Sequence, residues 1–211
     1  MKSKKSLVII IISIAVIAVY IAGYATNSGF EARFFGTKEQ VSSQKKEDIV
    51  ATIDGEKITQ NGFDSYKNGL NTGRQTKLTD KQVLDKIIER QVIYDEAVKE
   101  GFSVTDEEVD KEINTSRDAL TRNPEEYKSM KAYIISLNMT EDEYWKIQKP
   151  VYKKGLIIGK YKTAEKQKYM KDVMSKATSE VDKNFDEYFN KYFNKKVKEL
   201  ISKAKIQIFI K

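Results

Sequence analysis

The carboxylates between residues 106 and 110 are the side chains whose types and spacing come closest to a catalytic arrangement. Asp106, Glu107, Glu108 and Asp110 could exchange protons in general acid–base chemistry. They directly follow Thr105, however, where a helix is expected to start, and acidic side chains at a helix start are favoured by the helix dipole alone. The cluster is therefore given a structural role, and no catalytic residue is assigned.

Two residue types are missing altogether. The 211-residue chain contains no histidine and no cysteine. This excludes disulfides, thiol catalysis and thiolate metal sites, and it removes the commonest metal ligand and general base. The sequence also lacks a Gly-rich phosphate loop, a nucleophile elbow and the carboxylate spacing of a calcium loop. Neither a cofactor nor a metal is expected.

Aromatic side chains that carry a polar atom are the remaining candidates for a functional surface. Tyrosine and tryptophan suit binding surfaces that are half apolar and half wet. For each of them taken singly, a place in the core or on an ordinary surface is the alternative. The candidate contact residues are Tyr133, Tyr144, Trp145, Tyr152, Tyr188 and Tyr192.

The charge of the chain argues against nucleic acid as a partner. The formal net charge is +7, but Lys2, Lys4 and Lys5 supply three of these charges and leave +4 for the rest. The remaining basic residues are interspersed with Asp and Glu rather than gathered in a stripe.

An uncharged apolar run follows the first lysines. Residues 7–25, LVIIIISIAVIAVYIAGYA, have room for a helix of nineteen residues, which at about 1.5 Å per residue nearly spans a hydrocarbon layer of roughly 30 Å. Because lysines precede the run, we expect a single-pass signal anchor in the cell membrane, with the N-terminus cytoplasmic and the rest extracytoplasmic. The alternative is a signal peptide cleaved near Ala25 and a secreted protein. Residues 26–46 are polar and predict a tether, and residues 47–211 predict one folded domain.

Capping sequences mark where the helices of this domain begin. Three threonines are each followed, three residues later, by Gln or Glu and then by an amphipathic run, which is the pattern of a capping box. They are Thr79, Thr105 and Thr140. Gly101 predicts a left-handed stop for the first of these helices, and Asn123-Pro124 ends the second and opens another.

Later helices are expected to be long and lysine-rich. The helix after Thr140 contains Pro150 within its apolar pattern, which predicts a kink rather than an end. Gly155 and Gly159 predict close packing against another helix. Residues 160–178 are polar and are expected to bridge two parts of the fold through solvent. A final helix, FDEYFNKYFNKKVKELI, carries an apolar stripe that is typical of a core position.

Two strand patterns lie at opposite ends of the domain. The alternating run IVATI, residues 49–53, precedes Asp54-Gly55, the dipeptide that tight hairpin turns prefer. The last residues, KIQIFIK, alternate again and place Ile208 on the expected buried face, although Phe209 adds an apolar residue on the other face. These patterns are remote in sequence, so we expect each to pair with the other.

Taken together, these residues resemble a known family. The segments VATIDGEKITQNGFDSY and VLDKIIERQVIYDEAVKEGFSVTDEEVDKEI are similar to the N-terminal module of SurA/PrsA-type extracytoplasmic foldases. The similarity is closest over residues 49–115, looser through the Trp145 helix, and returns in SEVDKNFDEYFNKY and the closing strand. It implies a mainly α fold, in which a transmembrane helix precedes a helical domain whose small β-sheet joins an N-terminal hairpin to the C-terminal strand.

The chain departs from this family before the last helix. Foldases of this kind commonly insert a parvulin prolyl isomerase domain there, with an active site that typically uses histidines. Here SEVDKNFDEYFNKY runs directly into KKVKELISKAKIQIFIK, and the chain has no histidine. The resemblance therefore implies a chaperone without catalysis, a holdase that shelters unfolded or exported polypeptides.

Two alternatives stay open at this point. One is a dedicated assembly or adaptor protein for a single partner in an envelope or secretion complex, and the other is a foldase of the peptidyl-prolyl isomerase type. An open groove lined by aromatic residues would favour many clients, and a closed domain with one discrete patch would favour a single partner. Nothing in the sequence assigns an oligomeric state.

Overall fold

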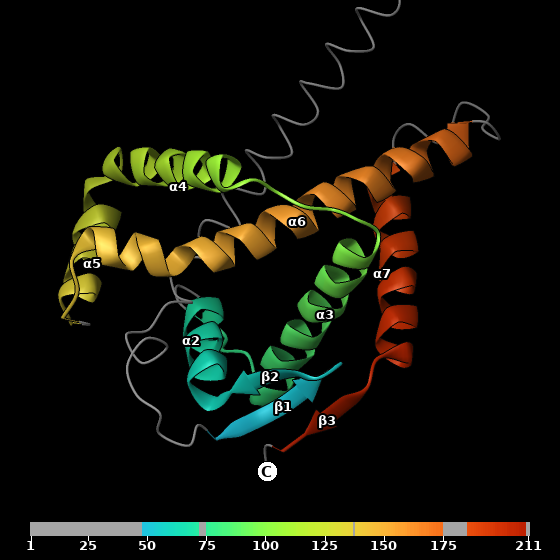
Figure 1. The fold of residues 1–211 in the computed structure, drawn as a ribbon, viewed down its shortest axis with the longest axis horizontal. Coiled ribbons are helices and arrows are strands. Elements are labelled where there is room, and N and C mark those ends of the chain that lie inside the picture. Colours follow the sequence, from blue (N-terminus) through green and yellow to red (C-terminus); the bar gives the residue numbers. More distant parts are fainter. Residues whose placement is uncertain (1–47, 72–74, 137, 175–184, 210–211) are drawn as a thin grey trace, which may run out of the picture.

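The described part of the chain is mainly helical with one small sheet, as the sequence predicts (Figure 1). The structure is a computed structural model, and it describes residues 48–71, 75–136, 138–174 and 185–209. The elements are β1 (Ile49–Ile53), β2 (Glu56–Thr59), α2 (Gln60–Asn71), α3 (Asp80–Lys99), α4 (Asp106–Thr121), α5 (Pro124–Ser136), α6 (Glu141–Met174), α7 (Phe185–Lys203) and β3 (Ile206–Ile208).

The predicted membrane segment and tether, residues 7–25 and 26–46, lie outside the described residues. Among the helices that the structure does describe, none combines the length and the apolar character that crossing a bilayer requires.

The two ends of the domain meet in the sheet, which confirms the predicted pairing. β1 lies between β2 and β3 and is antiparallel to both. Asp54 and Gly55 both have positive φ, 49° and 91°, which is the geometry of a type I′ hairpin turn. The Asp54 backbone also holds the returning strand, because its N–H donates to the Lys205 carbonyl oxygen at 3.0 Å.

One expectation about the closing strand was wrong. Ile208 lies opposite Ala51, which is fully buried, yet the Ile208 side chain is 55% exposed. The reason is that β3 is an edge strand whose strand neighbour in the described part of the chain is β1 alone. A charge at Ile208 would therefore meet solvent rather than the core.

The predicted helix boundaries are confirmed by their hydrogen bonds. Thr79 and Thr105 form complete capping boxes with Gln82 and Glu108. The Thr140 N–H donates to Glu143 Oε2 at 2.7 Å, and the Glu143 N–H donates to Thr140 Oγ1 at 3.3 Å. At the other end of α3, Gly101 has φ +86°, and the Phe102 N–H donates to the Ala97 carbonyl oxygen at 2.9 Å, as in a Schellman motif.

Helix α6 organises the rest of the fold. It continues through Pro150 and runs across the molecule, bending along its length (Figure 1). Its N-terminal half packs with α4 and α5, and we call these three segments together the arm. Its C-terminal half packs with α7, and we call these two segments together the corner. Gly155 lies against α3, where an added Cβ would sit 3.4 Å from Arg90 Nη2, but a Cβ on Gly159 would meet no described atom within 4 Å. The expectation of close packing therefore holds for Gly155 alone.

Candidate functional site

Four of the six aromatic candidates gather in the arm. Tyr133 and Tyr144 meet edge to face at 6.5 Å between ring centroids, Tyr144 and Trp145 at 5.4 Å, and Trp145 and Tyr152 at 6.3 Å. Tyr144, Trp145 and Tyr152 are buried, and Tyr133 is half-buried. These three rings lie inside the domain, so a client could reach them only if the surrounding helices separated.

A single carboxylate joins the three helices of the arm. Glu141, at the start of α6, accepts hydrogen bonds from Trp145 Nε1 at 3.2 Å and from the Tyr127 hydroxyl of α5 at 3.1 Å. Arg117 of α4 lies 3.6 Å from the same carboxylate and 5.9 Å from the centre of the Trp145 ring. These contacts indicate that the arm cluster has a structural role.

Three of the four carboxylates in the acidic cluster at the start of α4 form ion pairs within the fold. Asp106 pairs with Lys153 at 3.2 Å, Glu108 pairs with Lys160 at 2.7 Å, and Asp110 pairs with Lys149. The hydrogen bond from Lys160 and the backbone N–H of Thr105 lower the pKa of Glu108. Every partner lysine lies on α6, so the cluster fastens α4 to α6.

The other two candidates lie on α7, in the corner. Tyr192 is half-buried and stacks on Tyr169 of α6 with ring centroids 4.8 Å apart. Tyr188 is 45% exposed. The six candidates therefore fall into two groups at opposite ends of α6 and do not form one continuous surface. Tyr188 is the one that most clearly faces solvent.

The corner also contains a buried carboxylate. Glu165 of α6 is 3% exposed, and it lies 2.8 Å from Lys196 Nζ and accepts a hydrogen bond from the Tyr192 hydroxyl at 3.0 Å. Burial tends to lower the pKa of Lys196, but its contact with the Glu165 carboxylate and its electrostatic interaction with Tyr161 outweigh that effect and raise it. Burial also raises the pKa of Tyr161 to about 12. The positive charge of Lys196 and the negative charge of Glu165 therefore compensate each other in the contact between α6 and α7.

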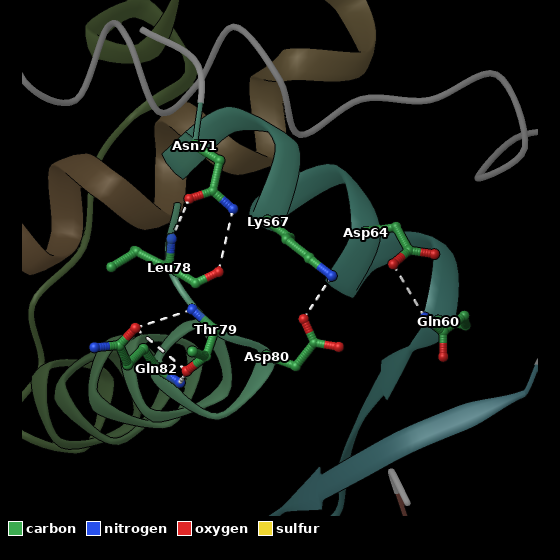
Figure 2. Close-up of polar contacts among 8 residues, drawn as sticks. All are labelled: Gln60, Asp64, Lys67, Asn71, Leu78, Thr79, Asp80 and Gln82. Carbon is green, nitrogen blue, oxygen red and sulfur yellow. Dashed lines mark hydrogen bonds and ion pairs between the residues drawn. The ribbon is translucent and has the colours of Figure 1, made fainter. Parts of the chain in front are cut away.

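Figure 2 shows the polar contacts that join α2 to α3. Asn71 is buried, its Oδ1 accepts the Leu78 N–H at 2.6 Å, and Lys67 of α2 lies 2.5 Å from Asp80 at the start of α3. Each of these groups caps a helix or closes the connection between two helices. Within the described residues, no group of three His, Cys, Asp or Glu side chains is placed to hold a metal ion.

Sequence reasoning missed most of the exposed apolar side chains. The large apolar residues that the structure leaves exposed are Val98, Ile135, Met170, Tyr188, Ile208 and Phe209. Met170 and Tyr188 lie on the corner helices, and Ile208 and Phe209 lie on or beside the edge strand. The one available signal was Phe209, which interrupts the alternation of the closing strand. The exposure of the other residues depends on which faces the helices cover in the folded chain.

Comparison with known proteins identifies the family. Residues 1–151 match the SurA-like N-terminal domain, a region that includes the hairpin, α2 to α5 and the first part of α6. No curated protein matches the chain. Helix α7 and β3 lie beyond the matched residues, yet β3 pairs with β1 inside them and completes the same sheet. The chain belongs to the family of SurA-like N-terminal domains.

Proposed function

We propose that this protein is a membrane-anchored extracytoplasmic holdase, which binds unfolded or exported polypeptides without catalysing a reaction. The observation that carries the proposal is family membership, because SurA-like N-terminal domains are associated with chaperone function. The apolar run of residues 7–25 supports the anchor. Exposed Met170, Tyr188, Ile208 and Phe209 supply apolar surface for a client.

An aggregation assay tests the holdase. The chain should slow the aggregation of several unrelated unfolded proteins at roughly stoichiometric ratio, because each bound client occupies one surface. Replacing Met170 and Tyr188 together by serine should weaken this protection. The matched control replaces Asn190 and Asn194, exposed polar residues of α7, by serine. Intact folding with no protection of any client would contradict the proposal.

The absence of catalysis is tested by prolyl isomerisation. The chain has no histidine, and no parvulin insert interrupts the run into α7. It should therefore not accelerate the cis-to-trans conversion of a prolyl peptide, which takes tens of seconds or longer without a catalyst. Rapid turnover would instead favour a foldase of the isomerase type.

A single-partner adaptor is the second candidate, and one observation favours it. Most of the predicted contact aromatics are turned inward, and the exposed apolar residues lie at separate places on α3, α5, the corner and the edge strand. A photocrosslinking residue at position 188 should capture many exported proteins from a holdase. Repeated capture of one protein would favour the adaptor.

The anchor has its own test. In fractionated cells the protein should stay with membranes after a high-salt wash, and protease added from outside should digest its folded domain. Full-length protein free in the cytoplasm would contradict the orientation. Release of a form that lacks residues 1–25 would favour cleavage near Ala25.

A further inference from the structure

At the outer edge of β3, some backbone N–H and C=O groups point away from the neighbouring strand β1. The Asp54 N–H donates to the Lys205 carbonyl oxygen at 3.0 Å, the Phe209 N–H donates to the Val50 carbonyl oxygen at 2.8 Å, and Gln207 is paired with Thr52. The odd-numbered residues of this stretch therefore face β1. Because antiparallel strands alternate the direction of their backbone groups, the N–H and C=O groups of Ile206 and Ile208 face outward.

Each face of this edge exposes one large apolar side chain. Ile208 is 55% exposed and Phe209 is 53% exposed, and neighbouring residues of a strand point to opposite sides. Edge strands of monomeric proteins are usually blunted by charged side chains, proline or a covering element. An edge with an exposed apolar residue on each face has the form of a strand-addition site, where backbone bonds supply affinity and alternate side chains supply specificity.

The charge around the edge indicates which kind of strand would bind there. Residues 203–209, from the end of α7 through the edge strand, contain two lysines and no acidic residue, and the Asp54 carboxylate of the hairpin turn accepts the Lys205 N–H at 2.8 Å. Lys203 and Lys205, directly before β3, are exposed. A second copy of this chain would bring a second set of these lysines to the same edge, and their like charges would repel each other. An acidic partner would bring complementary charges.

We propose that the outer edge of β3 binds an extended segment of a client polypeptide by strand addition, and that it selects segments in which apolar residues alternate with Asp or Glu. The proposal rests on the proposed function, since the occupant is a client. The incoming strand bonds to Ile206 and Ile208, covers Ile208 and Phe209, and places its carboxylates near Lys203 and Lys205.

Proline at position 208 is the most direct variant. The Ile208 N–H points away from β1, so Ile208→Pro removes an outward donor and leaves the bonds to β1 in place. The matched control is Lys57→Pro on the opposite edge. Thr52 faces β3, so its partner Lys57 on β2 likewise directs its N–H away from β1.

The probe is a fluorescent peptide of alternating valine and glutamate, titrated into the full chain in detergent micelles. We expect the unmodified chain and Lys57→Pro to bind it equally, and Ile208→Pro to bind it at least tenfold more weakly. N-methylation of alternate peptide nitrogens should also abolish binding. Equal binding by Ile208→Pro and the unmodified chain, or equal loss in both proline variants, would overturn the proposal.

Charge reversal gives a second measurement that leaves the backbone unchanged. Lys203→Glu combined with Lys205→Glu should weaken binding of the valine–glutamate peptide and strengthen binding of a matched valine–lysine peptide. An unchanged order of preference would overturn the selection of acidic segments, whether or not Ile208→Pro folds.

Other occupants give different results. If a second copy covered the edge, sedimentation would show a dimer that Ile208→Pro converts to a monomer. If residues 26–46 covered it, deleting them would raise affinity for the peptide. Either result would overturn the proposal. A chain that slows client aggregation equally well with and without Ile208→Pro would refute the edge site alone, whereas a chain that protects no client would refute the proposed function.

Discussion

In the arm, α6 is joined to α4 by exposed lysine–carboxylate pairs beside a buried ring cluster, whereas in the corner it is joined to α7 by stacked rings around a buried lysine–carboxylate pair. In the arm, Lys153 and Asp106 are 49% and 81% exposed. In the corner, the side chains of Lys196 and Glu165 are 21% and 4% exposed. Exposed pairs are screened by water and salt, and buried pairs are screened much less.

This difference predicts that the corner sets the stability of the domain and that the arm opens more easily. The corner also joins the elements most distant in sequence, because α7 packs on α3 and leads into β3, which pairs with β1. Loss of the corner would therefore release the sheet as well. Loss of the contacts between α4 and α6 would leave the sheet intact.

The largest expected effect is that of Phe193→Ala in the corner. Phe193 is 5% exposed, and its ring lies 5.7 Å from that of Phe189 and 6.3 Å from that of Tyr161. Deleting a buried ring leaves a cavity, so the free energy of unfolding should fall by about 3–5 kcal/mol in urea denaturation. Tyr188→Ala, on the exposed side of the same helix, is the matched control and should change it by less than about 1 kcal/mol. Equal losses would contradict the assignment of the corner as the core.

The second largest effect is expected from breaking the buried pair of Glu165 and Lys196. Glu165→Leu leaves Lys196 in the corner without its nearest carboxylate, and the remaining one, Glu100, is 3.7 Å away. Because Lys196 keeps some exposure, we expect a loss of about 2 kcal/mol, below the usual figure for a fully buried pair. Adding Lys196→Met should recover most of this loss. A double-mutant cycle measures the coupling, and additive losses would show that the two side chains do not stabilise each other.

The sequence predicts the elements of this fold better than it predicts its surfaces. Capping boxes, the Gly101 stop and the Asp54-Gly55 turn are local, because each depends on residues a few positions apart. The pairing of β1 with β3 was also predictable, since the two ends of the domain carry matching strand patterns. Exposure was not, because it depends on what covers each face: Ile208 follows a core alternation and lies at an open edge.

The same reason explains the mixed outcome for the aromatic candidates. Tyr144 and Tyr188 both occur at helical spacing in amphipathic runs, and the sequence offers no distinction between them. In the structure Tyr144 is fully buried because α5 packs over it, and Tyr188 is 45% exposed. Residues 160–178 were expected to bridge the fold through solvent. Helix α6 does continue from arm to corner as far as Met174, but Glu165, a polar residue of this stretch, is buried against α7 instead of facing solvent.

A smaller effect is expected from salt on the arm. The three pairs between α4 and α6 are exposed, and such pairs contribute about 0.2–1 kcal/mol each. Raising the salt concentration to about 1 M, where the Debye length falls to about 3 Å, should speed amide hydrogen exchange in α4 and leave α7 unchanged. Replacing the three lysines, Lys149, Lys153 and Lys160, by glutamine should have the same local effect at low salt and remove most of the salt response. Equal acceleration in α4 and α7 would show that the two regions open together.

The smallest effects should appear at opposite ends of the pH scale. Glu108 has a lowered pKa in the folded state, so its contribution to the arm is present above its ordinary value of 4.5 and is lost as the pH falls through the lowered one. Tyr161 has a pKa raised from 10.0 to about 12, because burial disfavours the phenolate. Its contribution to the corner is present below pH 10 and is lost as the pH rises through about 12, since the unfolded chain ionises first.

Hydrogen exchange should therefore report loosening of α4 in acid and of α7 in alkali. Glu108→Gln should reduce the acid response alone, and Tyr161→Phe should reduce the alkaline response alone. A variant that altered both responses equally would mean that α6 transmits opening from one of its ends to the other, and that arm and corner form one cooperative unit.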